Sequence, residues 1–248
     1  MLKKWLYTCN NLIFEYKQPL IIFLVTRVFI ISFLFIEHFF YPVSVSGASN
    51  FHFHKYFGNN FIEDYFSAYD SQYYLEIAKY GYTNIHDNPG LKIYAYFPLY
   101  PIIIKLFSIL TLGNLFLAGI LASTIFTLLA CIYLHKLILL DEHDKGNTTN
   151  KRLQYLLLFP TSVFLSAIYT ESLYLFLSIC CFYYARKRKW LLTGFLGYLA
   201  GLTRSTGILL FIPIAFEYWI YIKESGNTNL VSFLKSRKFE PAYLIIMP

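Results

Sequence analysis

The sequence contains long apolar runs, and the first of them places a strong constraint on the fold. Leu20 to Tyr41 is about as long as the hydrocarbon core of a bilayer is thick. The run lacks a clear small-residue cleavage site, so we interpret it as an uncleaved membrane anchor. Lys3, Lys4 and Lys17 precede it and predict a cytoplasmic N-terminus. Because lipid offers the backbone no hydrogen-bond partner, a chain that crosses a bilayer in this way is expected to be helical.

The composition extends this interpretation to the whole chain. Of 248 residues, 57% are hydrophobic and 14% are charged, whereas a soluble domain has about 45–50% and about 25%. Further apolar runs occupy residues 97–112, 115–140, 153–185, 190–203 and 207–222. We therefore predict one integral membrane domain over residues 1–248, folded as an all-α, multi-pass transmembrane bundle.

The basic residues are gathered at the ends of apolar runs. They lie at Lys3-Lys4, at Arg186-Lys187-Arg188-Lys189 and between Lys223 and Lys238. This is the pattern of cytoplasmic loops in membrane proteins. The net charge of +7 therefore does not indicate a nucleic-acid partner, and we expect membrane lipids instead.

Several classes of site are disfavoured because their motifs are missing. The sequence has no Walker loop, zinc-protease helix motif, nucleophile elbow or dinucleotide fingerprint. Its four cysteines show no paired spacing, which argues against a disulfide framework or a zinc site. His52 and His54 lack an evident third metal ligand. We expect no metal and no cofactor, and no segment resembles a soluble nucleotide-sugar domain.

The basic residues also predict which polar motifs share one face of the membrane. If residues 186–189 and 223–238 are cytoplasmic, the hairpin between them carries Arg204-Ser205 to the far side. The run that descends to residue 186 must start on that side, which places Thr170-Glu171 there as well. The long polar loop 42–96 follows the first span and is expected outside the cytoplasm. Three polar motifs therefore converge on the extracytoplasmic face.

This topology is consistent only if one apolar segment fails to cross the bilayer. Were both 97–112 and 115–140 to span it, Glu171 would lie on the cytoplasmic side. We expect 97–112 to be short, tilted or re-entrant. It starts with Phe97-Pro98-Leu99-Tyr100-Pro101, which would begin a helix stiffly or line a lipid groove.

Part of the long loop has helical periodicity. Between Phe61 and Tyr80, aromatic or apolar residues recur every four positions, at Phe61, Tyr65, Tyr69, Tyr73 and Ile77. This spacing predicts an amphipathic helix that lies on the membrane surface. A second short helix is expected on the cytoplasmic surface within residues 1–18.

Asp70 is the strongest candidate for a catalytic residue. It lies in Tyr69-Asp70-Ser71-Gln72-Tyr73-Tyr74, close to the predicted membrane surface. An ionised carboxylate near lipid is costly and usually has a functional or pairing reason. We predict a catalytic base at the bilayer interface, and the structural alternative is a helix N-cap or a surface acid.

Two further charged residues are candidates for substrate binding. Glu171 lies between two apolar runs, where it could line a substrate pocket or complement the dipole at a helix start. Arg204 is flanked by hydroxyl residues and has no acid nearby in the sequence. This pattern suits phosphate binding, although a snorkelling interfacial arginine has the same pattern.

Four motifs, in order, resemble those of the PIG-V family. They are Tyr-Asp-Ser-x-Tyr-Tyr-x-x-Ile-Ala-x-x-Gly-Tyr from Tyr69, Tyr-Phe-Pro-Leu-Tyr-Pro from Tyr96, Phe-Pro-Thr-Ser-x-Phe with Tyr-Thr-Glu-Ser from Phe159, and Gly-Leu-Thr-Arg-Ser-Thr-Gly from Gly201. The family comprises GPI mannosyltransferase 2 and its prokaryotic relatives, which are glycosyltransferases of the GT-C type. The resemblance covers about residues 20 to 222.

The resemblance implies a mannosyltransferase with a GT-C-like membrane fold. Its donor would be a polyprenyl (dolichyl) phosphate-mannose and its acceptor a lipid-linked glycan, with an α-1,6 linkage in the eukaryotic family. The active site would be extracytoplasmic, in the endoplasmic reticulum membrane of a eukaryote or the plasma membrane of a prokaryote. The family's first-loop aspartate matches Asp70, but the tryptophan that often precedes it is Tyr69 here.

The resemblance also suggests a role for each candidate residue. Asp70 would be the general base of an inverting transfer, and Arg204 would stabilise the departing lipid phosphate. Glu171 and the tyrosines after Asp70 would hold sugar hydroxyls. The full set expected to bind substrate is Arg204, Glu171, Tyr73, Tyr74, Ser71 and Ser205.

Two other functions stay open at this point. A non-enzymatic lipid carrier or flippase-like protein would also have a multi-pass body and charged residues at the interface. The sequence stops a few residues into another apolar stretch, Ala242 to Pro248, and the family's C-terminal spans are missing. We therefore expect a truncated chain, which raises the alternative of an accessory subunit in a glycosylation complex.

Overall fold

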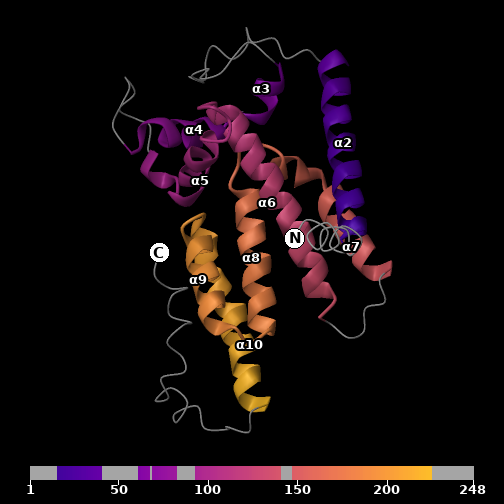
Figure 1. Ribbon diagram of the computed structural model, residues 1–248, viewed down its shortest axis with the longest axis vertical. Coiled ribbons are helices and arrows are strands. Elements are labelled where there is room, and N and C mark those ends of the chain that lie inside the picture. The colour runs from indigo at the N-terminus through magenta and orange to yellow at the C-terminus, as the bar shows by residue number, and fades with distance from the viewer. Residues whose placement is uncertain (1–15, 41–60, 68, 83–92, 141–146, 225–248) are drawn as a thin grey trace, which may run out of the picture.

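The computed structural model describes residues 16–40, 61–67, 69–82, 93–140 and 147–224. These residues form helices joined by short turns, and no strand occurs among them (Figure 1). The all-α prediction is therefore confirmed for this part of the chain. Most of the predicted helix at 1–18, both loop histidines and most of the basic stretch 223–238 lie outside the described residues.

Three helical segments are long and apolar enough to cross a membrane. They are α2 (Lys17–Phe40), α6 (Leu115–Ile138) and the continuous stretch of η4 (Ser205–Leu210) and α10 (Phe211–Glu224). Each has 20 residues or more, which at 1.5 Å per residue matches the hydrocarbon thickness of about 30 Å. The chain is a membrane protein, as its composition predicts.

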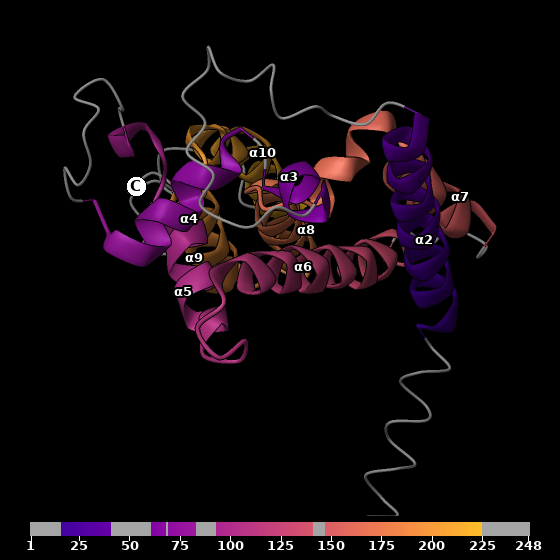
Figure 2. The same ribbon diagram turned by 90° about the horizontal axis from the view of Figure 1, so that it is seen from above.

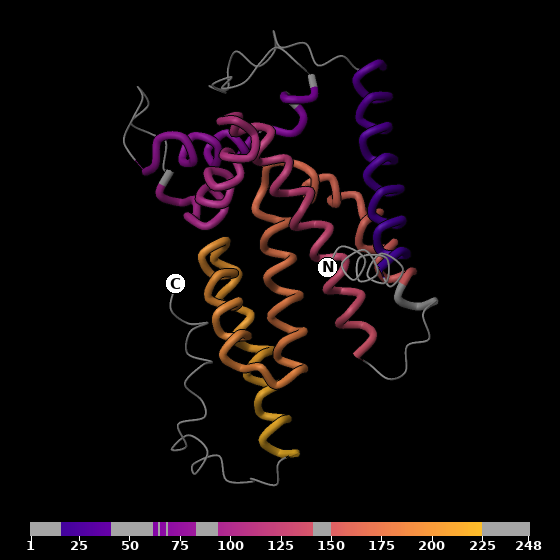
Figure 3. Tube along the Cα trace, in the orientation of Figure 1, coloured from indigo at the N-terminus to yellow at the C-terminus, as the bar shows by residue number. Residues whose placement is uncertain are grey.

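The centre of the bundle is the pair of helices α6 and α8 (Glu171–Arg186), which run parallel. Phe126 packs on Phe176 with ring centroids 5.5 Å apart. Further along both helices, the hydroxyls of Tyr133 and Tyr184 are 3.2 Å apart. Helix α9 (Trp190–Gly201) then returns beside α8, and α10 descends again (Figure 3). Figure 2 shows α2 and α7 (Asn147–Leu158) on one side of α6, with α4, α5 and α9 on the other.

One end of the bundle gathers basic residues. Arg186 at the end of α8 pairs with Glu217 of α10 at 2.9 Å, and Arg188 pairs with Glu224 at 2.7 Å. The end of α8 and the end of α10 therefore lie together, as the charge pattern predicts. Glu171 and Arg204 are at the opposite ends of these helices, close to each other.

Helix α5 (Leu99–Ser108) explains how the topology closes. It has ten residues, about 15 Å of helix, which is half of what a bilayer requires. The α6 helix therefore starts at the same end of the bundle as α5 and finishes at the end where α8 finishes (Figure 1). The helix within 97–112 is short, as predicted, and α9 is also short, with 12 residues.

The prediction of a single helix from Phe61 to Tyr80 is wrong. Two helices replace it, α3 (Phe61–Phe66) and α4 (Ser71–Tyr80), and Tyr69 between them has a positive φ of 52°. That conformation is incompatible with a continuous α-helix. The apolar face of α4 is buried against the protein, since Tyr74, Leu75 and Ala78 belong to the main core cluster. The residues that pack on the core are therefore largely not the ones that the four-residue spacing selected, since Tyr69 is 67% exposed.

An irregular segment interrupts the apolar run 153–185. Helix α7 is followed by the short 3₁₀ helix η3 (Pro160–Leu165) and a turn, before α8 begins. Thr127 donates to the carbonyl of Leu165, and Ser123 donates to that of Ala167, both at 2.7 Å. Side chains of α6 thus replace hydrogen bonds that a helix would have made, which is how an irregular backbone is tolerated in a membrane bundle.

Arg27 attaches α2 to the same irregular segment. Its guanidinium donates to the carbonyls of Ser162 at 3.0 Å and Leu157 at 3.2 Å, and to the hydroxyl of Ser166 at 2.7 Å. The side chain is buried, with 8% of its surface exposed. Its role is therefore to fix α2 against α7 and η3, where the carbonyl of Leu157 also accepts from the hydroxyl of Ser162 at 2.6 Å.

Replacing Arg27 with leucine should weaken the bundle. The Arg27→Leu variant leaves buried acceptors without their donor, which costs about 3 kcal/mol. We expect a lower melting temperature in detergent than for Val25→Ala, a substitution at a position that is 61% exposed on the same helix. Equal melting temperatures for the two variants would contradict this role.

Candidate active site

A cavity of about 270 Å³ lies at the end of the bundle opposite the basic residues. Its walls come from four places in the chain: the turn before α4, the end of η3, the start of α8 and the turn before η4. The lining residues are Tyr69, Asp70, Tyr74, Phe164, Tyr169, Thr170, Glu171 and Arg204. The fold thus brings three predicted charged residues, Asp70, Glu171 and Arg204, to one cavity.

Asp70 is at the N-cap position of α4, but its side chain does not make the hydrogen bond of an N-cap. It precedes the first residue of α4, yet its side chain accepts no hydrogen bond from that helix. Its Oδ1 instead accepts a hydrogen bond from the hydroxyl of Tyr96 at 3.1 Å. The N-cap alternative therefore does not account for Asp70, and its carboxylate faces the cavity.

Glu171 and Arg204 form an ion pair across the cavity wall. Nη1 of Arg204 is 2.6 Å from Oε1 of Glu171, and the two residues are 33 positions apart. Both side chains are partly exposed, at 40% for Arg204 and 30% for Glu171. Since one guanidinium has five N–H donors, the pair orients Arg204 and leaves it donors for a substrate anion.

Burial raises the pKa of the tyrosine hydroxyls around the cavity further above neutral pH. Burial raises the pKa of Tyr74 to about 12 and that of Tyr169 to about 12, with smaller contributions from the nearby charge of Asp70. Burial and the neighbouring Asp70 also raise the pKa of Tyr96 well above its usual value. These groups act as hydrogen-bond donors and acceptors at neutral pH, as sugar hydroxyls require of their partners.

Three predicted substrate-binding residues do not line the cavity. Ser71 is fully buried in the first turn of α4. Tyr73 stacks on Tyr96, with ring centroids 4.7 Å apart and planes inclined by 21°. Ser205 is exposed at the start of η4, outside the lining. Direct contact with a bound sugar stays a prediction for these three.

The sequence patterns assigned no role to four residues that the fold places at the site. Tyr96 reaches Asp70, and Phe164, Tyr169 and Thr170 line the cavity. Each of these four residues lies inside a sequence motif that also contains a candidate site residue or a proline. Their position within those motifs was the signal that could have identified them. A group of three His, Cys, Asp or Glu side chains placed to hold a metal is not found in the described parts of the chain.

Comparison with known protein families identifies the chain. The model of the family described as Mannosyltransferase (PIG-V) matches residues 16–235. The chain belongs to this mannosyltransferase family. Neither a curated protein nor a solved structure gives a significant match.

Membership of the PIG-V family makes the chain a glycosyltransferase. The family implies a lipid-linked sugar donor and a glycan acceptor in a membrane. It therefore favours an enzyme over the alternative of a lipid carrier.

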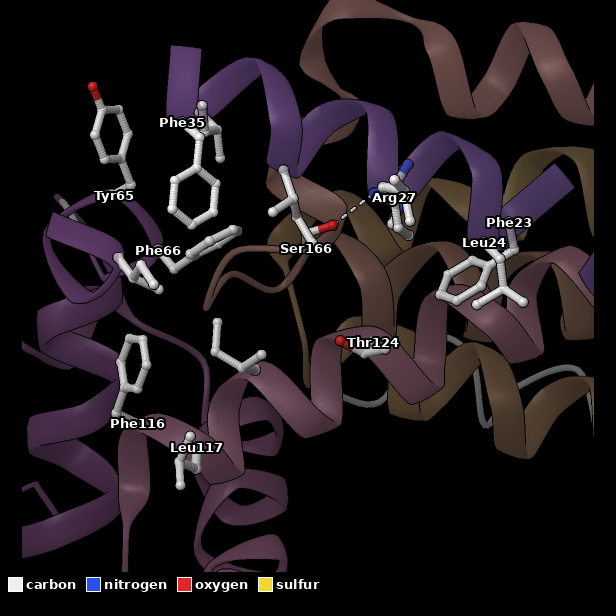
Figure 4. A pocket seen from close by; sticks show the side chains of 15 residues that line it. Phe23, Leu24, Arg27, Phe35, Tyr65, Phe66, Phe116, Leu117, Thr124 and Ser166 are labelled. Carbon is white, nitrogen blue, oxygen red and sulfur yellow. Dashed lines mark hydrogen bonds between the residues drawn. The ribbon is translucent and has the colours of Figure 1, made fainter. Parts of the chain in front are cut away.

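A second, apolar groove of about 520 Å³ lies between α2, α3 and α6 (Figure 4). Leu24 and Phe35 of α2 face Phe66 of α3 and Leu117 of α6 across it. Ser166, which accepts the hydrogen bond from Arg27, forms part of its inner wall. The segment after η3 therefore separates the groove from the polar cavity, since it contributes residues to both.

The turn that carries Arg204 depends on a close backbone contact at Gly207. A methyl group there would overlap the carbonyl group of Ala200 and the amide nitrogen of Gly201, whereas one at Gly201 would meet nothing within 4 Å. The amide of Gly207 also donates to the carbonyl of Arg204 at 2.9 Å. Gly207 thus allows η4 to fold back on the end of α9.

Gly207→Ala should disturb the site, and Gly201→Ala is its matched control. The overlap forces η4 away from α9 at a cost of about 1–3 kcal/mol, which moves Arg204 relative to Glu171. We expect a lower melting temperature and weaker mannosyl transfer for Gly207→Ala, with neither change in Gly201→Ala. Indistinguishable behaviour of the two variants would disprove the close approach.

Proposed function

We propose that this PIG-V family member transfers mannose from a polyprenyl-phosphate donor to a lipid-linked glycan, as GPI mannosyltransferase 2 does, with an α-1,6 linkage. The proposal specifies an inverting reaction of the GT-C type. The observation that carries it is the single cavity that holds Asp70, Glu171 and Arg204. A general base and an anion-binding cation on one small cavity are the two groups that transfer from a sugar phosphate requires.

The side of the membrane follows from charge. The cavity lies at the opposite end of α8 and α10 from Arg186 and Arg188. Positively charged ends of membrane helices face the cytoplasm. The site then faces the extracytoplasmic side, where a lipid-linked donor and acceptor are both within reach of the cavity.

Asp70 is the proposed base. Its carboxylate takes the proton from the attacking hydroxyl of the acceptor, and the oxygen of that hydroxyl forms a bond to the anomeric carbon of mannose. The bond from the anomeric carbon to the phosphate oxygen breaks on the opposite face. The electron pair leaves with the polyprenyl phosphate, so the anomeric centre is inverted.

Arg204 is the proposed partner of the leaving phosphate. The N–H groups that Glu171 does not use can donate to the phosphate oxygens as negative charge develops on them. Glu171 has a second carboxylate oxygen that makes no hydrogen bond to the described part of the protein. Because that oxygen is buried, we assign the hydroxyl of Tyr74 to the sugar hydroxyls and Glu171 to the orientation of Arg204.

The apolar groove between α2 and α6 supports a lipid-linked substrate. It is formed largely by segments long enough to span the bilayer, so its surroundings are hydrocarbon. The wall that it shares with the polar cavity places apolar and polar surfaces next to each other. A substrate with a hydrocarbon tail and a charged head fits this division.

Asp70→Asn should abolish transfer while the protein stays folded. Asparagine keeps an oxygen that can accept from Tyr96 but cannot take a proton, and loss of a general base lowers turnover about 10²–10⁴-fold. The measurement is transfer of radiolabel from polyprenyl-phosphate mannose to lipid in membranes that contain equal amounts of each protein.

Glu224→Gln is the matched control for this assay, because it also removes a carboxylate charge but lies at the other end of the bundle. Turnover close to wild type in Asp70→Asn would overturn the assignment of the base. Absence of transfer by wild-type protein would overturn the proposed donor or acceptor.

Arg204→Ala should weaken use of the donor. Hydrogen bonds to charged groups contribute about 1.5–3 kcal/mol, so we expect kcat/KM for the donor to fall by about 10–100-fold. Arg188→Ala removes an arginine that is paired in the same way at the basic end and should leave donor kinetics unchanged. Equal donor kinetics for the two variants would remove Arg204 from the phosphate role.

A further inference from the structure

Tyr96 lies where three aromatic side chains meet. Its ring stacks on Tyr73 at 4.7 Å and contacts the edge or face of Tyr74 at 5.2 Å with nearly perpendicular planes. Its hydroxyl donates to Oδ1 of Asp70 at 3.1 Å. The side chain is therefore held by ring contacts on α4 while its polar end reaches the proposed base.

We infer that Tyr96 is the positioning residue for Asp70, an inference that rests on the proposed function of Asp70 as a base. Within the described part of the chain, the hydroxyl of Tyr96 is the hydrogen-bond donor to this carboxylate, and no second one is found. The amides of α4 do not cap it. The orientation of the carboxylate in the cavity thus depends on one phenol.

The bond leaves the chemistry of Asp70 intact. A carboxylate has two oxygens, and Tyr96 occupies Oδ1. Oδ2 is left to take the proton from the acceptor hydroxyl. Holding one oxygen fixes the direction of the other, and such orientation of a reacting group contributes to rate without new binding energy.

Tyr96 is itself fixed to the rest of the site. Its carbonyl accepts from the hydroxyl of Tyr82 at 2.6 Å. Three residues later, the amide of Leu99 donates to the carbonyl of Leu202 at 3.1 Å, which joins the start of α5 to the turn that carries Arg204. The position of the phenol is therefore tied to both charged sides of the cavity.

The test compares Tyr96→Phe with Tyr133→Phe in the membrane transfer assay. Each variant loses one phenolic hydroxyl and keeps its ring, and Tyr133 bonds to Tyr184 towards the other end of α6 and α8. For Tyr96→Phe we expect kcat about tenfold lower and KM for the donor within about twofold of wild type. Tyr133→Phe should match wild type in both.

The outcomes separate this inference from the proposed function. If Asp70→Asn is inactive while Tyr96→Phe keeps the wild-type kcat, the inference is overturned and the base assignment stands. If Asp70→Asn is active, the proposed function fails and the inference fails with it.

Two further outcomes would also overturn it. A rise in KM alone would show that Tyr96 binds substrate instead of orienting the base. A lower melting temperature with an unchanged kcat for the folded protein would show a structural role.

Discussion

The site depends on one constraint, which is that backbone groups freed by a broken helix need partners inside a membrane bundle. The irregular segment after Pro160 is held because hydroxyls of α6, from Ser123 and Thr127, donate to its carbonyls. Ser123 and Thr127 are fully buried, so an unpaired carbonyl beside them would cost several kcal/mol. The path of the segment is thereby determined, and with it the place where α8 starts at Glu171.

A second interruption meets the first. The chain leaves α9 at Leu202, turns through Arg204 and begins η4 with Gly207 packed on the end of α9. A lone guanidinium beside lipid would be costly, and the start of α8 supplies Glu171 as its partner at 2.6 Å. The two breaks thus stabilise each other and together form one wall of a polar cavity in an apolar bundle.

Local patterns in the sequence correctly predicted the structural features that depend on residues close together in the chain. Apolar length gave the spans, and charge at helix ends gave the direction of α8 and α10. Counting crossings identified α5 as the short helix. Periodicity failed between Phe61 and Tyr80, because it cannot distinguish a continuous helix from two helices whose faces pack on the same core, with Tyr69 at positive φ between them.

The sequence by itself determined that this is a helical membrane protein, that its polar motifs cluster at one end and that Asp70 and Arg204 merit attention. Only the tertiary structure decided their partners. Glu171 lies 33 positions from Arg204, and Tyr96 lies 26 positions from Asp70. Apolar length and charge are properties of a single segment. These contacts exist only when four segments pack around one cavity. The spacing of residues along the chain does not show how those segments pack.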